Sequence, residues 1–175
     1  TAGGAIFAAW PLVYATAFCG FYFAMLLALF ALFFRPVGFD YRNKIQDKRW
    51  RSAWDWGLFI GGAVPALVFG IAFGNLLQGV PFHLDELLRP YYTGSFFALL
   101  NPFALLAGLI SLGMLTMHGA IWLQLRTGEP IAGRAKEWAR KIGLATIVGF
   151  ALAGIWLTLF VDGYKVVSMP PLDAI

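Results

Sequence analysis

The sequence predicts an all-α integral membrane protein, a helix bundle with about four transmembrane helices and the end of a preceding one. Of the 175 residues, 60% are hydrophobic and 13% are charged, whereas a soluble domain is typically about half apolar and about a quarter charged. The apolar residues form long blocks, which reach the roughly 20 residues that a helix needs to cross the hydrocarbon core of a bilayer. Soluble fold classes are therefore set aside.

The apolar blocks predict the membrane spans in chain order. Residues 1–10 are interpreted as the end of an earlier helix, because Pro11 has no amide hydrogen to donate and its ring clashes with the preceding turn. Four spans are then expected, at residues 12–34, 57–77, 96–123 and 142–160.

The segment after the first span carries turn and helix signals. Pro36 and Gly38 are expected to end that span in a turn. Residues 46–55 are expected to form a short surface helix, because charges of opposite sign lie four residues apart there, as Asp47–Arg51 and Arg51–Asp55.

The second and third spans carry packing and boundary signals. Glycines four residues apart on the second span predict close approach of a neighbouring helix, although a chain with 20 glycines also gives such spacings by chance. Asn101 followed by Pro102 predicts a kink or a helix start. The two glycine pairs are Gly57–Gly61 and Gly70–Gly74.

The basic residues predict the orientation of the chain in the membrane. Of the 13 lysines and arginines, eleven lie in the loops 35–56 and 124–141. Short loops rich in lysine and arginine stay in the cytoplasm, so these two loops are expected to be cytoplasmic. The loop 78–95 and the C-terminal segment are then periplasmic or external. The basic residues thus mark topology, and no nucleic-acid partner is expected.

The sequence offers few residues for chemistry. No span carries an acidic or basic side chain near its middle, where such a residue normally marks a transport pathway. No nucleotide-binding, zinc or nucleophile motif occurs, so no catalytic residue is assigned. His118 has two interpretations: an axial heme ligand, or a packing residue that hydrogen-bonds to another helix. The second is preferred.

Asp40 is the most informative carboxylate, because it follows the first span at the water boundary. Three cations lie near it in sequence and form a supporting charge cluster, Arg35, Arg42 and Lys44. A carboxylate at this position could take up protons from water and pass them inward. Alternatively, it pairs with a neighbouring arginine or caps the next turn.

Longer motifs then resemble a known family. The runs GGAIFAAWPLVY, FFRPVGFDYRNKI, RWRSAWDWG, AFGNLLQGVPF, LLNPFALLAG and FALAGIWL appear in order over almost the whole chain. Together they resemble subunit II of the cytochrome bd-type quinol oxidases. The resemblance implies that residues 1–175 form a single membrane region, the N-terminal half of a longer subunit whose first helix is missing.

The resemblance also implies a function. The protein would be a multi-pass subunit in the bacterial cytoplasmic membrane, part of a quinol:oxygen oxidoreductase and not catalytic alone. Hemes b and d would be bound by the partner subunit I, quinone would be present in the complex, and this chain would bind no cofactor. Asp40 matches the aspartate of the family's R-P-V-G-F-D motif, which is implicated in a proton route from the cytoplasm, whereas His118 falls at no heme-ligand position.

Two alternative functions remain from the residues alone. The chain could be part of a secondary transporter, since Pro65 lies inside a span and such transporters use broken helices. It could also be a membrane scaffold subunit, for which glycine-lined helix faces suffice.

Overall fold

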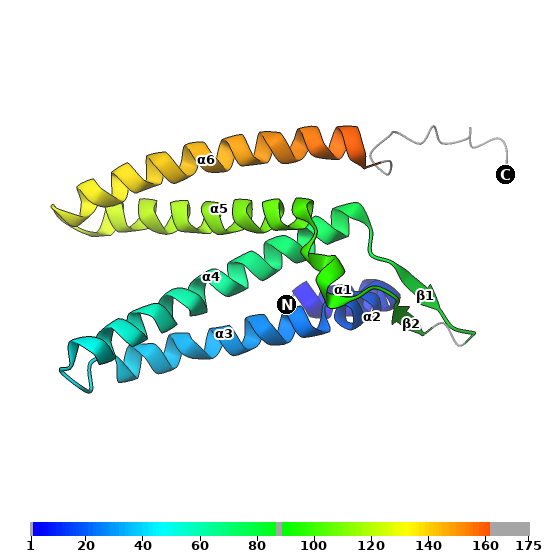
Figure 1. Ribbon diagram of the computed structural model, residues 1–175, viewed down its shortest axis with the longest axis horizontal. Helices are drawn as coiled ribbons and strands as arrows, with labels where there is room; N and C mark the ends of the chain where they lie inside the picture. The colour runs from blue at the N-terminus through cyan, green and yellow to red at the C-terminus, as the bar shows by residue number, and fades with distance from the viewer. Residues whose placement is uncertain (1, 87–88, 162–175) are drawn as a thin grey trace.

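The computed structural model describes residues 2–86 and 89–161, which form a helical bundle with one small β-hairpin (Figure 1). Four of its helices, α3 to α6, are long and apolar enough to cross a membrane. The predicted helical membrane bundle is therefore confirmed. The elements in chain order are α1 (Ala2–Ala9), α2 (Pro11–Gly20), α3 (Tyr22–Tyr41), α4 (Lys48–Gln78), β1 (Phe82–Leu84), β2 (Pro90–Tyr92), the 3-10 helix η1 (Phe96–Leu100), α5 (Pro102–Arg126) and α6 (Ile131–Phe160).

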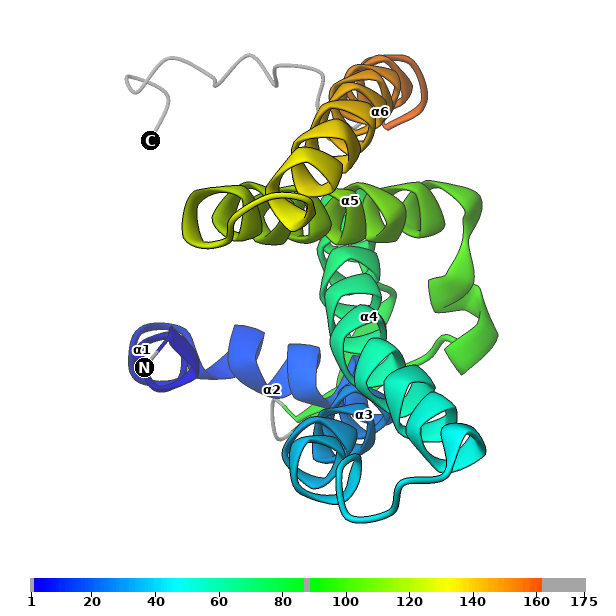
Figure 2. The ribbon, with the colours of Figure 1, turned by 90° about the vertical axis from the view of Figure 1, so that its left-hand side faces the viewer.

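The four long helices run up and down in a row, and each packs against the next in sequence. Figure 2 shows α4 and α5 between α3 and α6. The α3–α4 and α5–α6 connections lie at one end of the bundle, and the antiparallel hairpin β1–β2 and η1 lie at the other (Figure 1). The two basic loops therefore share one end, as the sequence predicts.

The first predicted span differs from the structure at both ends. Residues 12–34 are divided between α2 and α3, which meet at Phe21. The break before Pro11 is confirmed, and this proline occupies the first turn of α2, where no amide hydrogen is needed.

The expected turn at Pro36 and Gly38 is wrong, because α3 continues through both residues to Tyr41. Proline is tolerated inside membrane helices, since neighbouring groups compensate for the missing backbone hydrogen bond. Gly38 allows close packing instead of a turn. A Cβ at this position would lie 2.8 Å from Cδ2 of Leu58 on α4.

The expected separate surface helix at residues 46–55 is also wrong, because residues 48–55 form the first two turns of α4. At 1.5 Å per residue this 31-residue helix is about 46 Å long, so it projects beyond a hydrocarbon core of about 30 Å. Asp47 caps the helix by accepting the amide hydrogen of Arg49 at 3.0 Å. Among the described residues, neither of the two expected ion pairs of Arg51 is formed.

The last two spans are confirmed with changed boundaries. Asn101 caps α5 by accepting the amide hydrogen of Ala104 at 2.7 Å, so the Asn–Pro pair marks a helix start. Residues 96–100 form the separate helix η1. The helix α6 begins at Ile131, eleven residues before the expected span, so most of the basic loop 124–141 is helical.

The two glycine pairs of α4 are used for close helix packing, as predicted, and they face different neighbours. A Cβ at Gly61 would lie 2.9 Å from the carbonyl oxygen of Ala31 on α3. A Cβ at Gly70 would lie 2.7 Å from the carbonyl oxygen of Ala107 on α5. Hence α4 is held closely on both sides.

A buried amide network joins α4, η1 and α5 at the hairpin end. Asn75 is 5% exposed. Its Nδ2 donates to the carbonyl oxygens of Ile71 at 2.9 Å and Leu99 at 2.7 Å, and its Oδ1 accepts from Nδ2 of Asn101 at 3.0 Å. Every polar atom of this side chain is therefore paired, which a polar group in an apolar bundle requires.

Candidate functional site

Asp40 lies in the last turn of α3, at the bundle end that carries the basic loops, and it is exposed. Gly38 packs against α4, and helix residues two positions apart do not share a face. The side chain of Asp40 therefore points away from α4. Among the described residues, no hydrogen bond or ion pair involves Asp40.

Helix capping does not account for Asp40. Carboxylates cap the N-terminal end of a helix, where unpaired amide hydrogens are exposed, and Asp47 does this for α4. Asp40 lies at the C-terminal end of α3, where the helix dipole disfavours negative charge. The local pairing and capping interpretation thus has no contact to support it.

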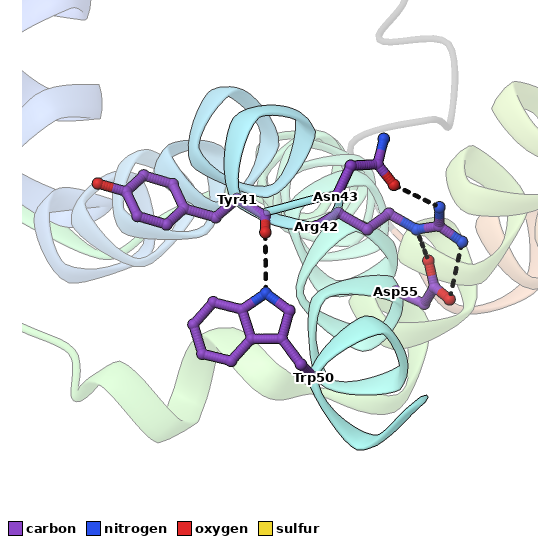
Figure 3. A network of polar contacts seen from close by, with 5 residues as sticks. All are labelled: Tyr41, Arg42, Asn43, Trp50 and Asp55. Carbon is purple, nitrogen blue, oxygen red and sulfur yellow. Dashed lines mark hydrogen bonds and ion pairs between the residues drawn. The ribbon is translucent and has the colours of Figure 1, made fainter. Parts of the chain in front are cut away.

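Arg42 is held by α4 and not by Asp40. It follows Gly38 by one helical turn, so it faces α4, where its Nε and Nη2 donate to the two carboxylate oxygens of Asp55 at 2.5 and 3.3 Å (Figure 3). Its Nη1 also donates to Oδ1 of Asn43 at 3.5 Å. These hydrogen bonds, with the negative charge of Asp55, hold the pKa of the Arg42 guanidinium above its usual value.

The other two cations of the predicted cluster also lie elsewhere. The ammonium of Lys44 lies 4.4 Å from the centre of the Tyr41 ring. The side chain of Arg35 runs beside α4, because a Cβ at Gly61 would lie 2.9 Å from its Cγ. The structure thus places Arg35, Arg42 and Lys44 at the same helix end as Asp40 but does not gather them around it.

Three aromatic residues, Tyr41, Trp50 and Trp54, connect this end of α3 to α4. The indole Nε1 of Trp50 donates to the carbonyl oxygen of Tyr41 at 2.8 Å (Figure 3). The ring of Trp54 lies between those of Tyr41 and Trp50, with centroids 5.9 and 5.8 Å away. The direction of Asp40 is therefore set by a well-packed helix end.

Asp55 and Trp50 are the contacts that sequence reasoning missed. The four-residue spacing in α4 favoured Arg51 as the partner of Asp55, whereas the partner lies 13 residues away across the α3–α4 connection. Trp50 contacts a backbone carbonyl nine residues earlier, across the same connection. The signal that could have found both is the short connection itself, which brings the two helix ends together.

His118 lies on α5 and is exposed. Its side chain has no hydrogen bond, ion pair or ring contact within the described residues, so no contact found there supports the preferred helix-packing interpretation. The described residues also contain no group of three or more His, Cys, Asp or Glu side chains that could hold a metal ion.

Comparison with known proteins places the chain in a family. Residues 1–173 match the family described as cytochrome bd terminal oxidase subunit II. The chain is 62% identical over 168 residues to cytochrome bd-I ubiquinol oxidase subunit 2 of Escherichia coli, covering 96% of this chain and 44% of that protein. It is 63% identical over 168 residues, with the same coverage, to a probable cytochrome oxidase subunit 2 of Haemophilus influenzae.

A more distant relative agrees with these two. The cytochrome bd ubiquinol oxidase subunit 2 of Bacillus subtilis is 33% identical over 156 residues, which is 89% of this chain and 45% of that protein. The chain thus spans somewhat under half the length of these relatives. These results show that the chain belongs to the cytochrome bd terminal oxidase subunit II family.

Proposed function

We propose that this chain is part of a non-heme-binding subunit of a terminal respiratory quinol oxidase. The family match over residues 1–173 carries the proposal, and the relatives named as ubiquinol oxidase subunit 2 supply the reaction class. The oxidase oxidises quinol and reduces dioxygen to water in the bacterial inner membrane. This chain supports assembly with subunit I, which holds hemes b and d and oxidises the quinol.

The second part of the proposal is that Asp40 is an entrance for the protons that the reaction consumes. Reduction of dioxygen to water takes up protons together with electrons. A carboxylate at the membrane boundary can collect these protons from water. Asp40 is exposed, is unpaired among the described residues, and has no capping role. The two basic connections at its end of the bundle favour the cytoplasmic side.

The charges near Asp40 favour this role as well. Arg42 is neutralised by Asp55, and Lys44 is held over Tyr41, so neither occupies the Asp40 carboxylate. A proton acceptor must keep its oxygens accessible, and an arginine bound to both oxygens would block them. The ion pair between α3 and α4 thus helps to leave the entrance open.

Replacing Asp40 by Asn in the complete oxidase tests the proton entrance. We expect quinol-driven oxygen uptake to fall about tenfold or more, because a positioned proton-transfer group typically contributes at least about a hundredfold and water replaces part of it. Asp47→Asn is the matched control. It removes a carboxylate from the same connection but keeps a good helix cap, so uptake should stay at the unsubstituted rate.

If the Asp40→Asn oxidase took up oxygen as fast as the unsubstituted oxidase at every pH, the role of Asp40 as a proton entrance would be refuted. The subunit assignment would be unaffected. The assignment is tested by purifying the full-length protein and recording its absorption spectrum. We expect b- and d-type heme to co-purify with a larger partner. A colourless protein that binds a solute would instead support the transporter interpretation.

A further inference from the structure

The outward face of α6 carries a stripe that we call the basic-apolar stripe. It consists of two cations followed by apolar side chains at spacings of three and four residues, which place them on one side of a helix: Lys136, Arg140, Leu144, Ile147 and Ala151. All five side chains are exposed, with Leu144 and Ile147 at 66% and 68%.

The opposite side of α6 is the one that packs in the bundle. Gly143 and Gly149 contact α5, since a Cβ there would lie 3.0 Å from Sδ of Met117 and 3.1 Å from Cγ1 of Ile110. Ala139 is also buried. The basic-apolar stripe therefore faces away from α5.

Among the residues that the structure describes, the two cations of the stripe have no anionic partner, although a neighbouring lysine has one. Lys141 pairs with Glu137 at 2.6 Å. In the part of the chain that the structure describes, neither Lys136 nor Arg140 has an ion pair or a hydrogen bond from its side chain. Like charges four residues apart on a helix repel each other, so an anion between these two side chains would stabilise α6.

The depth of the cations identifies the environment of this anion. The apolar part of α6 begins at residue 142, so at 1.5 Å per residue Arg140 lies about 3 Å and Lys136 about 9 Å outside it. The headgroup layer extends about 5–8 Å beyond the hydrocarbon on each side of a bilayer. The two cations thus bracket the layer in which phospholipid phosphates lie.

We propose that Lys136 and Arg140 bind the phosphodiester of an anionic phospholipid whose acyl chains lie along Leu144, Ile147 and Ala151. Such a lipid carries a negative headgroup above apolar chains, which is the order in which the stripe presents its cations and apolar side chains. This lipid site lies on α6, whereas Asp40 lies on α3. The lipid proposal therefore does not depend on the proposed role of Asp40.

The test measures lipid binding in the assembled oxidase complex. The complex is released from vesicles of phosphatidylcholine and phosphatidylglycerol, and the retained lipids are counted by native mass spectrometry. We expect retention of phosphatidylglycerol over phosphatidylcholine. A hydrogen bond to a charged partner contributes about tenfold or more to binding, so Lys136→Gln with Arg140→Gln should lower the preference by more than about tenfold.

A charge-matched control separates a site from general attraction. Lys48→Gln with Arg49→Gln removes two cations from the same end of the bundle, but adjacent helix residues do not share a face. This control should keep the preference, and so should the conservative exchange Lys136→Arg with Arg140→Lys. If the double glutamine variant does not assemble, Arg140→Gln alone should lower the preference by about tenfold.

Three outcomes would overturn the proposal. An equal loss in the stripe variant and in the Lys48/Arg49 control would mean diffuse attraction without a site. Unchanged retention in the stripe variant would place the lipid elsewhere. No preference in the unsubstituted complex would mean that another occupant, such as an acidic side chain of a neighbouring segment, covers the stripe.

Discussion

Gly70→Ala should destabilise the protein because it inserts a methyl group between α4 and α5. The new Cβ would lie 2.6 Å from Cβ of Ser111 and 2.7 Å from both the Ala107 carbonyl oxygen and Cα of Gly108. Two of these atoms are backbone, so a rotamer change cannot make room and the helices must separate. Overpacking costs about 1–3 kcal/mol, and the upper end applies here.

The helix propensity of alanine offsets part of this cost. Alanine is more favourable than glycine in a helix by about 1 kcal/mol, which leaves a net loss of about 2 kcal/mol in the free energy of unfolding for Gly70→Ala. Gly62→Ala on the same helix is the control, since nothing lies within 4 Å of its new Cβ. That variant should gain up to about 1 kcal/mol.

The measurement is the free energy of unfolding of the complete subunit in mixed detergent micelles. The free energies of unfolding of the two alanine variants should differ by about 3 kcal/mol, which is the overpacking cost alone, because both variants gain the same helix propensity. If neither alanine variant were less stable than the unsubstituted subunit, the inference that Gly70 is required for the α4–α5 contact would be refuted. A loss at Gly62 as large as that at Gly70 would instead indicate a neighbour of α4 outside the described residues.

Two further predictions concern polar contacts. Asn75→Leu leaves the Leu99 carbonyl and the Asn101 amide without partners, so it should lower the free energy of unfolding by about 1–3 kcal/mol; an unchanged value in the same micelles would mean that water or lipid replaces the network. Replacing Arg42 by Gln and Asp55 by Asn, singly and together, should give a coupling that shrinks as salt rises from about 0.01 M to about 1 M, because the Debye length falls from about 30 to about 3 Å. A coupling independent of salt would contradict the exposed position of the pair.

The helices were predictable because a bilayer demands long apolar segments, but their ends were not. Hydropathy marks where lipid begins, whereas backbone hydrogen bonds determine where a helix ends. The helix α6 therefore starts at Ile131, well before the apolar segment that was predicted, and α3 continues past Pro36. The breaks at Pro11 and Asn101 were predictable because proline suits the first turn of a helix.

The surroundings of Asp40 were predictable only in part. Sequence proximity placed Arg35, Arg42 and Lys44 near it, and the structure keeps them at the same helix end. Sequence proximity does not give direction, and residues two apart on a helix point to opposite sides. The pairing of Arg42 with Asp55 depends on how two helices meet, which a local pattern does not contain.

The amide network of Asn75 also sets an order of events during synthesis. Leu99 and Asn101 follow Asn75 by 24 and 26 residues in sequence, so they leave the ribosome after α4. At that stage Asn75 has its hydrogen bond to Ile71 within its own helix, which lowers the cost of entering the lipid. The remaining partners come with η1 and with Asn101 at the start of α5, so the side chain of Asn75 is fully paired only once these segments pack against α4.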